Sequence, residues 1–127
     1  MTAPAWIEAV VSEFGKAAGL GTLALSERGA VALAFDNGMV LRLEYAFESL
    51  AIVLSTPVRM DPQTAARLLA YAHPGVRPSF KLRVGYLAKS GAAVFAGRLA
   101  DREVTLPALN SVFGTLWRIA HEFGGAQ

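Results

Sequence analysis

The stretch LRVGYLAKSGAAVFAGRLADREVTLP, residues 82–107, holds two predicted strands, the turn between them and the start of a helix. Leu82, Val84 and Tyr86 alternate with charged or small residues, which is the period-two pattern of a strand with one buried face. Residues 94–99 repeat the pattern as the returning strand. We therefore expect an antiparallel hairpin that leads directly into the final helix.

The final helix is predicted from its start signals and its apolar stripe. Thr105 suits the N-cap, and Pro107 is tolerated in the first turn because its missing N–H has no helical partner there. Apolar residues then recur at helical spacing on one side of the helix. They are Leu106, Leu109, Val112, Phe113, Leu116, Trp117, Ile119, Ala120 and Phe123.

A second amphipathic helix is predicted near the N-terminus, with Thr2 as its cap and Pro4 in its first turn. Its apolar stripe comprises Trp6, Ile7, Val10, Val11, Phe14, Ala17 and Ala18. Gly19 and Gly21 end it, because glycine readily adopts the backbone conformations of a helix exit.

Strands are predicted between these helices. Leu23 and Leu25 indicate a first short strand, and residues 31–35 and 39–45 alternate on either side of Asp36-Asn37-Gly38, a strong hairpin signal. Residues 50–55 are almost all apolar, which is typical of a strand buried on both faces.

A third helix is predicted from Asp61, an N-cap, and Pro62 to about Ala72. Only Gln63 and Arg67 make it clearly polar, so we expect it to be buried, with a second subunit as one candidate to cover it.

The order of elements indicates one α+β domain over residues 1–127: helix, three or four strands, helix, two strands, helix. Helices should flank an antiparallel sheet in the order α-β-β-β(-β)-α-β-β-α.

The composition favours a protein that binds a partner. Hydrophobic residues make up 54% of the chain and charged residues 17%, against typical values of about 45–50% and 25%. A small domain this apolar has more apolar surface than it can easily bury alone. The chain lacks Cys, a secretion signal and an apolar run long enough to span a membrane, so we expect a soluble, cytoplasmic protein.

The sequence offers no recognisable catalytic, metal or cofactor site. It contains no G-x-S-x-G, no G-x-G-x-x-G and no G-K-[ST], and its two histidines, His73 and His121, have no acidic pair at ligand spacing. We therefore expect no enzyme activity, no cofactor and no metal.

Two alternatives to a protein-binding function stay open at this stage. A small-molecule-binding or sensory α+β domain would place Trp6, Phe35 and Tyr45 near a pocket. A nucleic-acid binder would use the basic residues of 77–102, although Phe80 and Tyr86 fall on the opposite strand face from Lys81 and Arg83. That geometry favours a solvated outer face and no nucleic-acid partner.

Three segments carry a resemblance to a known family. They are WIEAVVSEFGKAAGL (Trp6–Leu20), LRVGYL (Leu82–Leu87) and LADREVTLPALNSVFGTLWRI (Leu99–Ile119). With the order of elements, they resemble the class I type III secretion chaperones, the Tir-chaperone (CesT-like) family, and within it the SycN branch. The strand-loop-helix junction with Thr-Leu-Pro is the most specific part.

The resemblance implies a bacterial chaperone that catalyses nothing and keeps the N-terminal segment of a secreted protein extended. For the SycN branch this client is the gatekeeper (YopN-like) protein, and a second related class I chaperone joins the dimer; a homodimer and another effector are the alternatives. Client-binding candidates are Trp6, Val10, Phe14, Leu23, Leu25, Val31, Leu33 and Phe35. Candidates for the dimer interface are Ala65, Leu68, Leu69, Ala72, Val84, Tyr86 and Val94.

Overall fold

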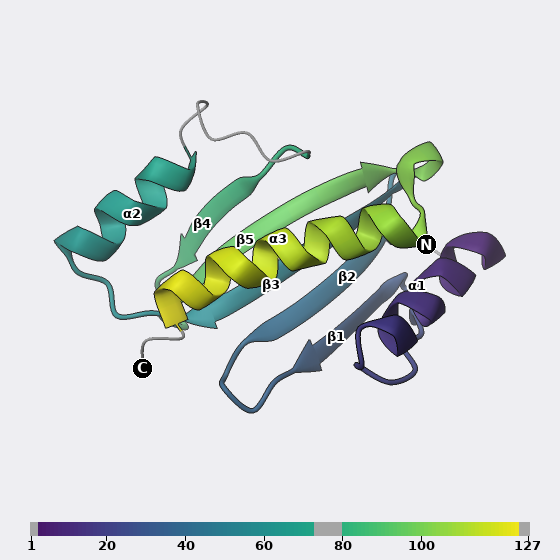
Figure 1. Ribbon diagram of the computed structural model, residues 1–127, viewed down its shortest axis with the longest axis horizontal. Coiled ribbons are helices and arrows are strands. Elements are labelled where there is room, and N and C mark those ends of the chain that lie inside the picture. The colour runs from purple at the N-terminus through teal and green to yellow at the C-terminus, as the bar shows by residue number, and fades with distance from the viewer. Residues whose placement is uncertain (1–2, 73–79, 125–127) are drawn as a thin grey trace.

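A five-stranded antiparallel sheet forms the centre of the computed structural model, which describes residues 3–72 and 80–124 (Figure 1). The strands lie in the order β1-β2-β3-β5-β4, so β1 and β4 form the two edges. Their bounds are β1 Ala30–Ala34, β2 Val40–Ala46, β3 Ser49–Pro57, β4 Arg83–Leu87 and β5 Ala92–Ala100.

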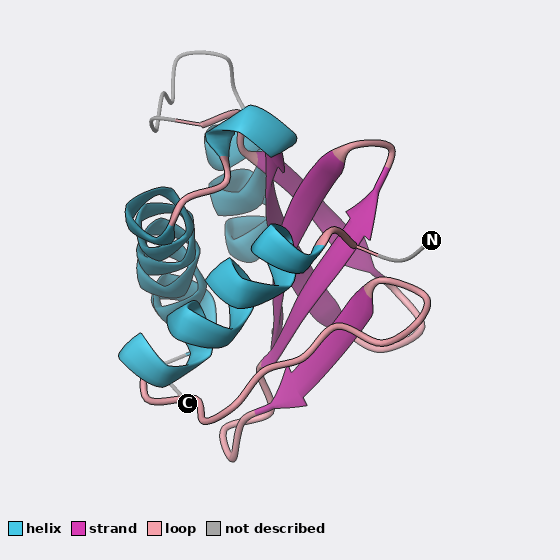
Figure 2. Cartoon of the chain, turned by 90° about the vertical axis from the view of Figure 1, so that its right-hand side faces the viewer, coloured by secondary structure: helices cyan, strands magenta, loops and turns pink. Residues whose placement is uncertain are grey.

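Three helices flank the sheet: α1 Ala5–Ala17, α2 Pro62–Ala72 and α3 Leu106–Gly124, with a short 3₁₀ turn, η1 Asp101–Glu103, before α3. Figure 2 shows the helices on one side of the sheet and the other side bare. Helix α3 crosses the middle of the sheet against β3 and β5, while α2 packs against the edge strand β4 (Figure 1). The predicted α+β class and order of elements are confirmed.

The core lies between the sheet and helices α1 and α3. Alternate residues of the central strands point into it: Leu50, Ile52 and Leu54 of β3 are buried, as is Phe95 of β5. The apolar stripes of the two helices cover them, with Phe14 edge-on to Phe113 at 5.4 Å between ring centroids. Burying each large apolar side chain contributes about 1.5–3 kcal/mol, so the two stripes fix the helices on this face.

Predicted caps and turns appear where the sequence placed them, with one exception. The Thr105 hydroxyl accepts the Ala108 N–H at 3.1 Å, and the Asp61 carboxylate accepts the Thr64 N–H at 2.8 Å. Gly38 closes the β1–β2 hairpin with φ of 89°. For α1 the N-cap is Pro4, outside the predicted first turn, and Thr2 lies outside the described residues.

The expected short strand at Leu23 and Leu25 is wrong. Both side chains are buried in the core, but their backbone forms no ladder with another strand in the described chain. The segment instead packs against α1, where a Cβ on Gly15 would lie 2.6 Å from the Gly21 carbonyl oxygen. Alternating leucines therefore mark burial here, without strand pairing.

The turn between β2 and β3 uses no glycine. Phe47 and Glu48 have φ of 54° and 57°, a left-handed conformation that is costly for a bulky residue. The Asp101 N–H donates to the Glu48 carbonyl oxygen at 3.0 Å, and the Ser49 hydroxyl donates to the Ala46 carbonyl oxygen at 3.0 Å. These two bonds hold the turn and leave the Phe47 ring 85% exposed.

Candidate binding surfaces

Large apolar side chains are exposed in three parts of the described chain. Four of them gather around α2 and β4, one lies on α1, and one is at the β2–β3 turn. They are Met60, Leu69, Tyr86 and Leu87, then Trp6, and then Phe47. Contiguous exposed apolar surface is where soluble proteins bind partners, so α2–β4 and α1 are the first places to examine.

The α2–β4 surface is a groove of about 320 Å³ lined by Met60, Ala65, Leu68, Leu69, Val84, Gly85 and Tyr86. Helix α2 forms one wall and the edge strand β4 the other. The N-terminus of α2 is fixed by Asp61, and the bond from the Thr64 N–H lowers the pKa of the Asp61 carboxyl. An ionised cap is also favourable at the positive end of the helix dipole.

Helix α2 is held to α3 by its opposite side. The Arg67 guanidinium donates to the Glu122 carbonyl oxygen at 2.6 Å and lies 4.5 Å from the centre of the Phe123 ring. The Tyr71 hydroxyl donates to the Glu122 carboxylate, and burial together with this bond raises the pKa of that hydroxyl. These contacts fix the orientation of α2, so Leu69 is held facing outward.

The edge strand β1 offers backbone groups for pairing. The Tyr45 N–H of β2 donates to the Gly29 carbonyl oxygen at 2.7 Å, and the Phe35 N–H donates to the carbonyl oxygen of Met39, just before β2, at 2.8 Å. Because antiparallel pairing alternates, Val31 and Leu33 also bond to β2, whereas the N–H and C=O of Ala32 and Ala34 point away from the sheet. Within residues 3–72 and 80–124, no other segment bonds to the outward backbone groups of Ala32 and Ala34.

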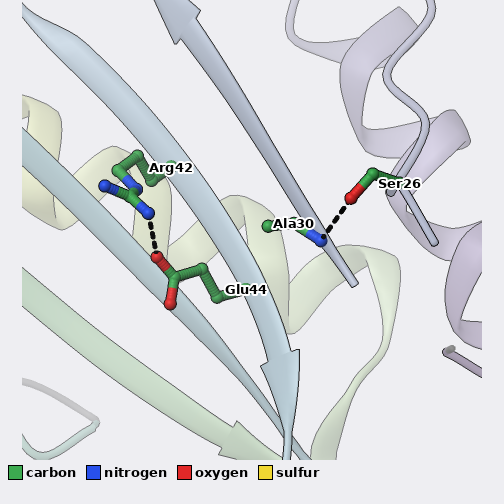
Figure 3. A network of polar contacts seen from close by, with 4 residues as sticks. All are labelled: Ser26, Ala30, Arg42 and Glu44. Atoms are coloured by element: carbon green, nitrogen blue, oxygen red, sulfur yellow. Dashed lines mark hydrogen bonds and ion pairs between the residues drawn. The ribbon is translucent and has the colours of Figure 1, made fainter. Parts of the chain in front are cut away.

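Ser26 limits this open edge at one end. Its hydroxyl accepts the Ala30 N–H at 3.4 Å, and its N–H donates to the Ala30 carbonyl oxygen at 2.9 Å (Figure 3). The edge is therefore capped at Ala30 and open at Ala32 and Ala34. An added strand could gain main-chain hydrogen bonds over this short length only.

The comparisons with known proteins identify the family. The profile of the type III secretory system chaperone SycN family matches residues 6–123. The chain belongs to this family. It is therefore a type III secretion chaperone, a protein that binds secreted proteins and catalyses no reaction.

Solved structures share the fold of this SycN-family chaperone. The ExsC–ExsE complex contains a chain with a TM-score of 0.78 and 20% identity, covering 96% of this chain and 93% of that one. The HopA1–SchA chaperone-effector complex gives 0.72 and 18%, covering 92% and 91%. The Yersinia pestis chaperone SycH, in complex with a fragment of YscM2, gives 0.68 and 18%, covering 92% and 98%. No curated protein sequence matches the chain.

The structure brings together most of the predicted dimer-interface residues of this chaperone. Ala65, Leu68, Leu69, Val84 and Tyr86 all line the α2–β4 groove. Val94 does not, because it pairs with Gly85 and so lies on the sheet face opposite to Val84 and Tyr86. Ala72 is the last residue of α2. Met60, which the sequence reasoning missed, lies in the loop before the Asp61 cap.

The predicted client-binding residues divide by burial. Trp6 is 47% exposed, Val31, Leu33 and Phe35 are half-buried on β1 and its turn, and Val10 is half-buried on α1. Phe14, Leu23 and Leu25 are buried in the core. A client cannot reach these three without opening the fold, so only the exposed and half-buried members remain surface candidates.

Two of the three residues suggested for a small-molecule pocket, Phe35 and Tyr45, make contacts within the fold. The Tyr45 hydroxyl donates to the half-buried Asp101 carboxylate at 3.0 Å, and Phe35 packs edge-on against Trp117 at 5.0 Å between ring centroids. The α2–β4 groove is lined by other residues. No cluster of metal-ligating side chains and no helix able to cross a membrane occurs among the described residues.

Proposed function

We propose that this chaperone keeps the N-terminal segment of a gatekeeper-type (YopN-like) secreted protein extended in the bacterial cytoplasm until secretion. The open edge of β1, at Ala32 and Ala34, carries this proposal because it can pair with an extended chain. Trp6 of α1 and Val31, Leu33 and Phe35 of β1 and its turn would receive the client's apolar side chains.

The α2–β4 groove would hold a second, related class I chaperone in a heterodimer. Its apolar lining includes Leu69, Met60 and Tyr86, each at least one-third exposed, and burying that surface would stabilise a dimer. The neighbouring edge strand β4 could extend the contact through its backbone. A second copy of this chain is the alternative occupant, and the mass of the purified assembly distinguishes the two.

Three preparations of the chaperone test the proposal. The chaperone is expressed alone, with the N-terminal segment of a gatekeeper-like protein from the same gene cluster, and with a neighbouring class I chaperone as well. Light scattering on the purified material should give a defined complex that contains the segment. A chain that stays monomeric in all three preparations would contradict the proposal.

A further inference from the structure

The bare face of the sheet is hollowed into a groove distinct from the surfaces above. Its volume is about 430 Å³, and it lies over the face that no helix covers (Figure 2). The residues that line it are Glu44, Ser49, Ala51, Val53, Lys81, Arg83, Ala96, Gly97, Arg98, Ala100 and Glu103.

Strand register explains the shape of this groove. Glu44, Ala51 and Arg98 form one row across β2, β3 and β5, because Ala51 pairs with both of its neighbours. The next row contains Arg42, Val53, Ala96 and Arg83. Long charged side chains therefore stand at the ends of these rows, on β2, β5 and β4, while the floor between them consists of small apolar side chains.

Two acids and three cations line the groove, and both acids already have partners. On the β2 side, Glu44 is paired with Arg42 at 2.5 Å (Figure 3). At the β5 end, the Glu103 carboxylate accepts the Ala100 N–H at 2.8 Å. The three cations, Lys81, Arg83 and Arg98, gather on the β4–β5 side of the groove.

Among the described residues, the three cations form no ion pair with a carboxylate. All ten Asp and Glu residues lie in the described ranges, and Arg42–Glu44 is the only ion pair found there. Arg98 instead donates to the Ser49 hydroxyl at 2.9 Å. Continuing the Arg83–Ala96 register by two residues, beyond the end of the ladder, would place Lys81 opposite Arg98, and like charges in facing positions are destabilising.

We propose that this bare-face groove binds an acidic amphipathic segment of the client, with apolar residues on the Ala51–Val53–Ala96 floor and carboxylates toward Lys81, Arg83 and Arg98. The inference rests on the proposed function and adds the chemical class of segment that the chaperone selects. Carboxylates there would relieve the repulsion among the three cations and would form charge-assisted hydrogen bonds with the two arginines.

A polypeptide fits this groove better than a nucleic acid. Proteins that bind single strands interleave cations with aromatic rings on which bases stack. Here the nearby rings lie on the other face: Phe80 packs over Gly97, and Tyr86 pairs with the buried Ala93. Small aliphatic side chains on the floor suit apolar side chains of a peptide.

Fluorescence anisotropy with two synthetic peptides tests the proposal. Both have the same length and the same apolar positions, and their polar positions carry only Glu in one and only Lys in the other. The wild-type chaperone should bind the Glu peptide at least about tenfold more tightly, and the preference should shrink between about 50 and 300 mM NaCl. In Lys81→Glu/Arg83→Glu the preference should disappear or reverse.

The control variant Arg28→Glu/Arg118→Glu has the same net charge but alters exposed residues outside the groove, so it should keep the preference. Equal binding of the two peptides, or a preference that survives Lys81→Glu/Arg83→Glu, would overturn the proposal. Tighter binding of a single-stranded oligonucleotide than of the Glu peptide would overturn it in favour of a nucleic-acid site. If the chaperone holds a secreted segment but shows no charge preference, only this inference fails; if it holds no segment, the proposed function fails.

Discussion

Leu68 and Leu69 are neighbours in α2 but lie in opposite environments: Leu68 is 7% exposed and Leu69 is 72% exposed. Leu68 packs into the core, and Leu69 faces outward beside Met60 and Tyr86. One residue of helix rotation, about 100°, separates a side chain that stabilises the fold from one available to a partner.

Leu69→Asp should abolish dimer formation and leave the fold intact, because it places a charge in an apolar contact that the monomer does not need. Light scattering should show a monomer, and circular dichroism should show an unchanged spectrum and a cooperative melting transition for that monomer. Leu68→Asp is the matched control and should unfold the chain, since its charge would enter the core. A dimeric Leu69→Asp variant would move the interface elsewhere.

Trp6→Ala should weaken client binding about tenfold while changing stability little, because roughly half of the ring is exposed on α1. Isothermal titration with the secreted segment measures the affinity, and urea unfolding measures the stability. Ile7→Ala, on the buried side of the same helix, should cost about 2–5 kcal/mol of stability. If Trp6→Ala destabilises the fold as much as Ile7→Ala does, Trp6 belongs to the core.

Ala32→Pro should weaken client binding roughly two- to tenfold, the effect of losing one or two main-chain hydrogen bonds at the β1 edge. Its N–H points away from β2, so the sheet should tolerate the substitution, which circular dichroism can verify. Leu33→Pro removes a bond within the β1–β2 ladder and should destabilise the sheet. Undiminished binding by a folded Ala32→Pro variant would exclude strand addition at this edge.

Gly97→Ala should destabilise the fold by about 1–3 kcal/mol through overpacking. A Cβ at this position would lie 2.7 Å from two ring carbons of Phe80 and 3.0 Å from a methyl carbon of Val112. Gly114→Ala is the control, since its Cβ would meet nothing within 4 Å, and it should stabilise α3 by about 0.5–1 kcal/mol. A melting temperature for Gly97→Ala equal to that of the wild type would show that Phe80 moves aside at no cost.

The sequence alone was sufficient to predict the order of the elements, because strong local signals mark them. Thr105 and Asp61 cap helices where expected, and Gly38 closes the predicted hairpin. The alternation of Leu82, Val84 and Tyr86 against Lys81 and Arg83 correctly separated the two faces of this stretch. These features depend on neighbours only a few residues away.

Features that depend on distant contacts were not predictable from local pattern. The Phe47–Glu48 turn lacks the usual glycine because a bond from Asp101, far along the chain, helps to hold it. Leu23 and Leu25 read as a strand, although packing against α1 decides their position. Val94 was grouped with Val84 because only the register of β4 on β5 reveals that they lie on opposite faces.

Hydrogen exchange on the complex between this chaperone and the N-terminal segment of its secreted client tests the central claim most directly. If the chaperone holds an extended chain, most client amides should exchange fast, a short client stretch should be protected, and Ala32 and Ala34 should gain protection on binding. A client segment protected throughout like a folded domain, or a complex that leaves Ala32 and Ala34 unchanged, would contradict the account.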